Sequence, residues 1–129
     1  MNLTKEELQQ QLAAIQKEED NKIIQEALPY FQSFKGKCFR TRNMYSSKEA
    51  WFLYIKVLDV KEEDIYVSGG RALSNYEGVS FQTDSYGQTT ISKESSYIHS
   101  IEDYSEITDE EFNKEVVKMI SNVYNLLYL

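Results

Sequence analysis

Residues 50–67 decide the fold and read AWFLYIKVLDVKEEDIYV. From Ala50 to Val60 apolar side chains occupy both alternating positions of an extended chain, and Lys56 is the exception on one face. A strand that is apolar on both faces needs cover from both sides, so this pattern predicts the centre of a small sheet. The four residues 61–64 have the length of a hairpin loop, which predicts a hairpin with strands at 50–60 and 65–67.

Both ends of the chain carry helix-start signals. Thr4 and Thr108 are each followed by a glutamate three residues later, which is the pattern of a capping box. The first signal predicts a helix over residues 4–28 that Pro29 ends or kinks. The second predicts a helix over residues 108–129. Its apolar stripe consists of Phe112, Val116, Met119, Ile120, Val123 and Leu127.

The predicted fold class is α+β, in a single domain of 129 residues. An N-terminal amphipathic helical segment spans residues 1–35, and about five antiparallel strands span residues 37–101 as a bent sheet or a small SH3-like barrel. The C-terminal amphipathic helix at 108–129 completes the order, and we expect the two helices to cover the sheet. Because the stripe of the first helix is too broken for a coiled coil, that helix could dock on its own sheet or on that of a neighbour, so a homodimer stays open.

Composition favours a folded, soluble chain. Hydrophobic residues make up 41% and aromatic residues 13%. Cys38 is the only cysteine, and no signal sequence follows Met1, so we expect a cytoplasmic protein. No apolar run approaches the roughly 20 residues of a membrane span. The net charge of −7 argues against a general DNA-binding protein.

Negative charge is concentrated near the C-terminus. Residues 102–115 hold seven acids and one lysine, so −6 of the net −7 lies there. The acids at 109–111 fall in the first turn of the predicted helix, where the helix dipole favours them. The three acids that precede the helix are candidates for binding a basic protein partner, or for pairing with the basic segment of the same chain. These candidates are Glu102, Asp103 and Glu106.

Positive charge is concentrated in residues 35–48, which contain five cations and no acid. Small barrels bind single-stranded nucleic acid by stacking bases on aromatic rings beside a cationic groove. This strand is therefore the candidate nucleic-acid site. Its candidate residues are Lys37, Arg40, Arg42 and Tyr45.

Catalytic, cofactor and metal motifs are not predicted. Cys38 and His99 could form a nucleophile–base pair oriented by Glu102 or Asp103, but no local signature accompanies either residue. One histidine and one cysteine far apart match no zinc spacing. The Gly69-Gly70 pair lacks the further glycines and the helix start of a phosphate-binding loop.

Three segments follow one another along the chain: FKGKCFR at 34–40, WFLYIKVLDV at 51–60 and EITDEEF at 106–112. With the glycine-containing hairpins between them, they resemble small uncharacterised proteins of bacteriophages and integrated elements, over roughly residues 34–112. The resemblance implies an origin class and a contact with a host or phage protein, and it implies no catalytic residues.

Three functional hypotheses follow from the sequence. The leading one is a non-enzymatic protein-binding module, of the phage accessory or inhibitory type, that acts through its acidic surface. The alternative is a small barrel that binds single-stranded nucleic acid through its basic strand. An enzyme that uses Cys38 and His99 comes third.

Overall fold

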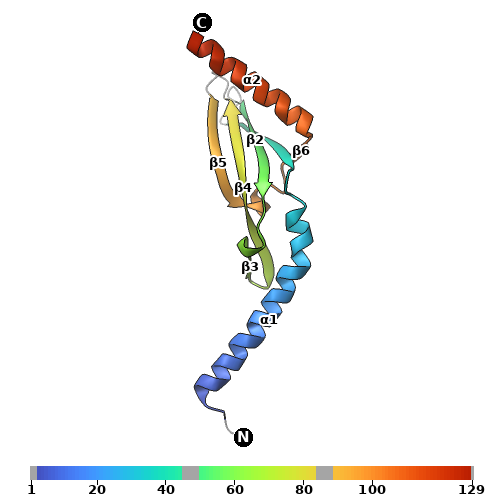
Figure 1. Ribbon diagram of the computed structural model, residues 1–129, viewed down its shortest axis with the longest axis vertical. Helices are drawn as coiled ribbons and strands as arrows, with labels where there is room; N and C mark the ends of the chain where they lie inside the picture. The colour runs from blue at the N-terminus through green and yellow to red at the C-terminus, as the bar shows by residue number, and fades with distance from the viewer. Residues whose placement is uncertain (1–2, 45–49, 84–88, 129) are drawn as a thin grey trace.

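The computed structural model describes residues 3–44, 50–83 and 89–128 (Figure 1). These residues form two α-helices, one near each end of the chain, with six strands and two short 3-10 helices between them. In chain order they are α1 (Lys5–Gln32), β1 (Cys38–Met44), β2 (Ala50–Asp59), η1 (Glu62–Asp64), β3 (Ile65–Ser68), β4 (Arg71–Thr83), β5 (Thr89–Tyr97), η2 (Ile98–Ser100), β6 (Ser105–Ile107) and α2 (Asp109–Tyr128).

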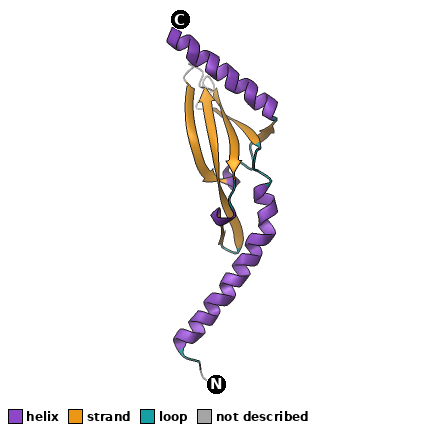
Figure 2. Cartoon of the chain, viewed as in Figure 1, coloured by secondary structure: helices purple, strands orange, loops and turns teal. Residues whose placement is uncertain are grey.

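The strands, drawn in orange in Figure 2, form one antiparallel sheet. Their order is β3-β4-β2-β1-β6, with β5 paired to β4. Within the described residues β5 pairs only with β4, and β6 pairs only with β1. The sheet is therefore bent and open, not a closed barrel. The α+β prediction is confirmed, with helices at both ends and the strands between them.

The predicted hairpin loop at 61–64 is wrong. Residues 62–64 form η1, and both β2 and β3 run antiparallel to β4, pairing with its residues 77–83 and 71–74 respectively. The chain reverses instead at Gly69 and Gly70, whose φ angles are 59° and 75°. A two-residue hairpin loop with both φ angles positive favours glycine, so this pair was the stronger turn signal. Loop length alone gave the wrong position.

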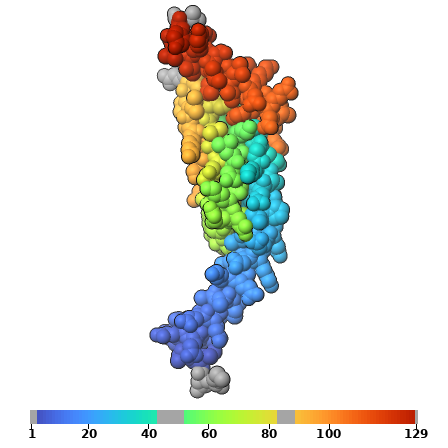
Figure 3. All heavy atoms as spheres, viewed as in Figure 1, coloured from blue at the N-terminus to red at the C-terminus, as the bar shows by residue number. Residues whose placement is uncertain are grey.

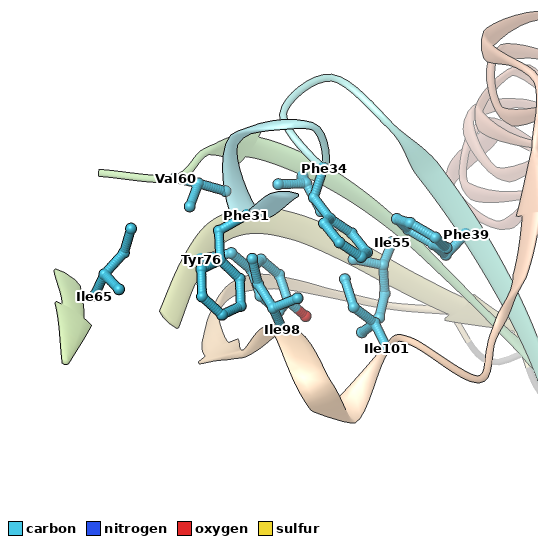
Figure 4. Packing of buried hydrophobic residues seen from close by; sticks show 10 residues of the cluster. Phe31, Phe34, Phe39, Ile55, Val60, Ile65, Tyr76, Ile98 and Ile101 are labelled. Atoms are coloured by element: carbon cyan, nitrogen blue, oxygen red, sulfur yellow. The ribbon is translucent and has the colours of Figure 1, made fainter. Parts of the chain in front are cut away.

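One face of the sheet packs on the end of α1. Phe34 stacks on Phe39 with ring centroids 5.8 Å apart (Figure 4). Val57 is fully buried in the same cluster. The register shifts between Val57 and Asp59, so the strand alternation breaks there and Val60 joins the same cluster as Val57. The cluster consists of Phe31, Phe34, Phe39, Ile55, Val57, Val60, Ile65, Tyr76, Ile98 and Ile101.

The opposite face packs on the start of α2. The rings of Tyr54 and Phe81 stack at 5.0 Å, and Phe81 meets the edge of Phe112 from α2 at 5.4 Å. Cys38 completes this second buried cluster. Each helix thus packs on part of one face of the sheet. Successive residues of β2 belong to the two clusters, which explains why this strand is apolar on both faces.

Both helices extend beyond the part that packs. Pro29 does not end α1, which continues to Gln32 because Phe31 is buried in the core. The side chains of residues 5–19 are all exposed, and this half of α1 projects away from the sheet (Figure 3). Among the described residues of either helix, no stretch is long and apolar enough to cross a membrane.

Candidate functional site

Six carboxylates lie within or directly beside the edge strand β6 in the sequence, and we call this surface the acidic edge. Its strand, β6, pairs with β1 through Ser105 opposite Arg40, and no described strand pairs with its other side. All six side chains are exposed. The acidic edge consists of Glu102, Asp103, Glu106, Asp109, Glu110 and Glu111.

The first turn of α2 accounts for part of the acidic edge. Thr108 is the cap, and its Oγ1 accepts a hydrogen bond of 3.1 Å from the backbone amide of Glu111. Acids at 109–111 therefore complement the free amides and the dipole of the helix start. Glu102, Asp103 and Glu106 have no such role, because they precede the helix.

Only weak ion pairs neutralise the acidic edge. The Lys37 Nζ atom lies 3.7 Å from Glu106 Oε1, and the Lys56 Nζ atom lies 4.0 Å from Asp109 Oδ1. Exposed pairs at these distances contribute little free energy and leave the carboxylates accessible. Over the described part of the chain, Asp103 and Glu110 have no cation within ion-pair distance.

Glu102 also lines a cleft between α1 and the β3–β4 hairpin. The cleft has a volume of about 510 Å³, and its polar lining comes from α1, β4 and the segment after β5. Partial burial raises the pKa of the Tyr30 hydroxyl, and the charge of Glu102, which accepts a hydrogen bond from that hydroxyl, raises it further. The polar lining residues are Glu26, Tyr30, Arg71, Ser74, His99 and Glu102.

Sequence reasoning missed this cleft. Its residues come from segments around positions 26, 71 and 99, so only the antiparallel pairing of β3 with β4 and the docking of α1 bring them together. The signal that could have pointed to it was the Gly69-Gly70 pair, because Gly70 of the hairpin turn lines the cleft.

The basic strand divides between the two faces of the sheet. Lys37 lies on the α1 side, 5.6 Å from the Phe34 ring centroid. Arg40 and Arg42 lie on the other face, with their Cζ atoms 5.4 Å and 5.9 Å from the centroid of Phe52. The structure therefore does not bring Lys37 together with the two arginines, and Tyr45 lies outside the described residues.

The arginines do not pair with the acids at 102–106. Arg40 shares a small hollow with Glu111 and Glu115 of α2, whose volume is about 150 Å³. Phe52 is 37% exposed and is flanked by both guanidinium groups. This gives a compact basic and aromatic patch beside acids, which we call the arginine patch: Arg40, Arg42 and Phe52.

Cys38 and His99 lie on opposite sides of the sheet. Cys38 is 1% exposed in the cluster beneath α2, and its Sγ atom donates to Asp109 Oδ1 at 3.2 Å. Burial and then this carboxylate raise the pKa of the thiol to about 12. His99 lines the cleft on the α1 side and stacks on Tyr97 at 5.2 Å. A nucleophilic cysteine needs a lowered pKa, so this geometry does not support the nucleophile–base pair.

Metal coordination has no support in the described segments, which contain no group of three potential ligands among His, Cys, Asp and Glu. Comparison of the chain with protein families, curated proteins and solved structures finds no match. The geometry of the surfaces therefore carries the functional proposal.

Proposed function

We propose that this protein is a non-enzymatic protein-binding module that recognises a basic partner through its acidic edge. The observation that carries the proposal is the coincidence of exposed carboxylates with a sheet edge that no described strand covers. Six acids fall within residues 102–111, and the ion pairs around them are long and exposed.

The chemistry of this edge favours a protein partner. An uncovered strand presents backbone amides and carbonyls that an extended segment of another protein can pair with. The carboxylates favour lysine and arginine in that segment, and they raise the rate of encounter at low salt. Since β6 has only three residues, its backbone can supply a short pairing, and the flanking charges must supply the specificity.

Glu102 connects the acidic edge to the cleft. A basic side chain that reaches past the edge meets a second carboxylate, Glu26, and the exposed ring of Tyr30. Cations are attracted both to carboxylates and to the faces of aromatic rings. Arg71 also lines the cleft, but the two carboxylates outnumber it, so the cleft can hold one lysine or arginine of the same partner.

Two finer parts of the proposal rest on the sequence alone. The role as a phage-type accessory or inhibitory protein follows from the resemblance of residues 34–112 and remains a prediction. We also expect the protein to act in the cytoplasm, because its single cysteine fits a reducing compartment.

The test is capture of a partner from the native host with a charge-reversed acidic edge. The variant carries Glu102→Lys, Asp103→Lys and Glu106→Lys. The matched control reverses the three acids of η1, Glu62, Glu63 and Asp64, because it changes the net charge equally and lies away from the edge. We expect a protein that the wild type and the control retain and the edge variant loses.

Two results would contradict the proposal. Equal capture by both variants would show that the acidic edge is not the binding surface. Equal loss by both would show that the partner responds to net charge and not to this edge.

A second candidate function is binding of single-stranded nucleic acid at the arginine patch. The two guanidinium groups over the exposed Phe52 ring favour it. The test is fluorescence anisotropy of a labelled oligonucleotide across a salt series, with Arg40→Glu compared with Arg71→Glu as a control on another surface. Salt-dependent binding that only Arg40→Glu abolishes would support this function over the first.

A further inference from the structure

We propose that two copies of this protein associate through an antiparallel pairing of the projecting halves of α1. The feature that points to this pairing is a single stripe on the helix with opposite charges at its two ends. Spacings of three and four residues place the stripe on one side of the helix. The stripe reads Lys5, Leu8, Leu12, Ile15, Glu19, and it is too short for a coiled coil but sufficient for a weak pair of helices.

The stripe is exposed in the single chain. Leu12 is 59% exposed, and Leu8 and Ile15 are about half exposed. Contacts of α1 with the core begin at Ile24, so the first four turns of the helix pack on nothing in the described chain. The bond from Glu7 N to Thr4 Oγ1 (3.1 Å) supports this segment locally. A helix of about 15 residues is nonetheless marginal in water without tertiary packing.

Charge complementarity indicates that the stripe pairs with the same stripe of a second copy, in antiparallel orientation. With a two-fold axis at Leu12, Lys5 lies seven residues before the axis and Glu19 seven after it, so each lysine meets the glutamate of the other copy. Leu8 and Ile15 lie four and three residues from the axis, so they fall at heights within about 1.5 Å. A parallel pairing would stack Lys5 on Lys5 and Glu19 on Glu19, and like charges repel at such positions.

The flanks and the length of the free helix also fit. Uncharged glutamines border the middle of the stripe at Gln9, Gln11 and Gln16 and add no repulsion there, whereas Glu18 borders it beside Glu19. In this pairing Thr4 of one copy is level with residue 20 of the other. The second helix therefore ends before Ile24, where α1 begins to pack on its own sheet. Because the N-terminal half of α1 projects away from the sheet (Figure 1), the two sheets of such a dimer would lie at its opposite ends.

The contact is small, about 22 Å long with six apolar side chains. Interfaces at the low end of the size range are weak and reversible, so we expect dissociation in the range of roughly 10–100 µM. The exposed end of α2 does not indicate which partner it would bind, since residues 119–128 carry no charge that would select one.

The experiment is sedimentation equilibrium of the full chain from about 5 to 500 µM, at low salt. Leu12→Glu places two carboxylates at the two-fold axis, and we expect it to abolish the dimer. Gln10→Glu, on the opposite side of the helix, adds the same charge and should leave the dimer intact. Circular dichroism confirms that both variants fold, which is expected because both positions are exposed.

A charge swap tests the orientation. Lys5→Glu and Glu19→Lys should each weaken the dimer by about 3- to 10-fold, because each creates two like-charge pairs, and the double variant should restore it. A wild type that stays monomeric at 500 µM would overturn the proposal. So would a dimer that survives Leu12→Glu, or one that neither single reversal weakens.

Discussion

Gly78→Ala should destabilise the fold by forcing apart the two central strands. Gly78 lies on β4 opposite Val57 of β2. A Cβ atom at this position would lie 2.5 Å from the backbone carbonyl oxygen of Lys56 and 3.2 Å from Cε2 of Tyr76. Ordinary contact begins near 3.4 Å, so β2 must move by several tenths of an ångström or more. The carbonyl belongs to a paired strand with buried neighbours, so it cannot rotate away as a side chain could.

The expected cost is about 2 kcal/mol, since overpacking a well-packed core costs roughly 1–3 kcal/mol and the lower entropy of unfolded alanine offsets only part of it. For a chain of 129 residues this corresponds to a Tm about 8 °C lower. Urea denaturation followed by far-UV circular dichroism measures the free energy of unfolding. Ser92→Ala, at an exposed position of β5, is the control and should change it by less than about 0.5 kcal/mol. A Gly78→Ala variant as stable as the wild type would refute the close approach of β2 and β4.

Further predictions concern buried residues of the two clusters. The free energy of unfolding should fall as pH rises from about 9 to 12, because the pKa of Cys38 is raised from 9.0 to about 12 in the fold and that of Tyr76, on the other face, from 10.0 to about 12. In this pH range both groups stay protonated in the fold and ionise in the unfolded chain. Cys38→Ala should therefore reduce the pH dependence of the free energy of unfolding. A thiol reagent at pH 8 should modify Cys38 of the native protein only as the protein unfolds. Phe112→Ala should cost about 3 kcal/mol in urea denaturation, because the ring is buried against Phe81, whereas Leu127→Ala, at a position 71% exposed, should be nearly neutral. Equal effects of these two substitutions would contradict the docking of α2 through its first turn.

The sequence predicted the fold class because its strongest signals are local. The capping pairs at Thr4 and Thr108 fix the helix starts, and the structure has both caps. The two-sided apolar pattern of residues 50–60 identified the central strand. These signals depend on residues close together in the sequence, so they can be recognised without knowledge of the tertiary structure.

The hairpin was misplaced because loop length competed with turn chemistry. Residues 61–64 are charged and of suitable length for a hairpin loop. They contain η1, after which β3 continues in the direction of β2 and pairs with the same strand, β4. Gly69 and Gly70 hold the positive φ angles that reverse the chain. Of the two alternatives for Pro29, that it ends the helix is wrong, because α1 continues to Gln32 and Phe31 beyond the proline is buried.

The candidate sites were predicted as residue types and not as surfaces. The sequence identified both charged segments, but only the pairing of β6 with β1 places them on adjacent strands. Strand alternation also separates Lys37 from Arg40 and Arg42. Tertiary packing decided the rest, since the burial of Cys38 and its bond to Asp109 join positions 71 residues apart.

Hydrogen exchange of the free protein and of its complex with the captured host protein tests the binding surface most directly. We predict that binding protects the backbone amides of β6 and the residues around it, 102–111, and leaves those at 40–42 unchanged. Protection confined to residues 40–42, with none at 102–111, would contradict recognition through the acidic edge.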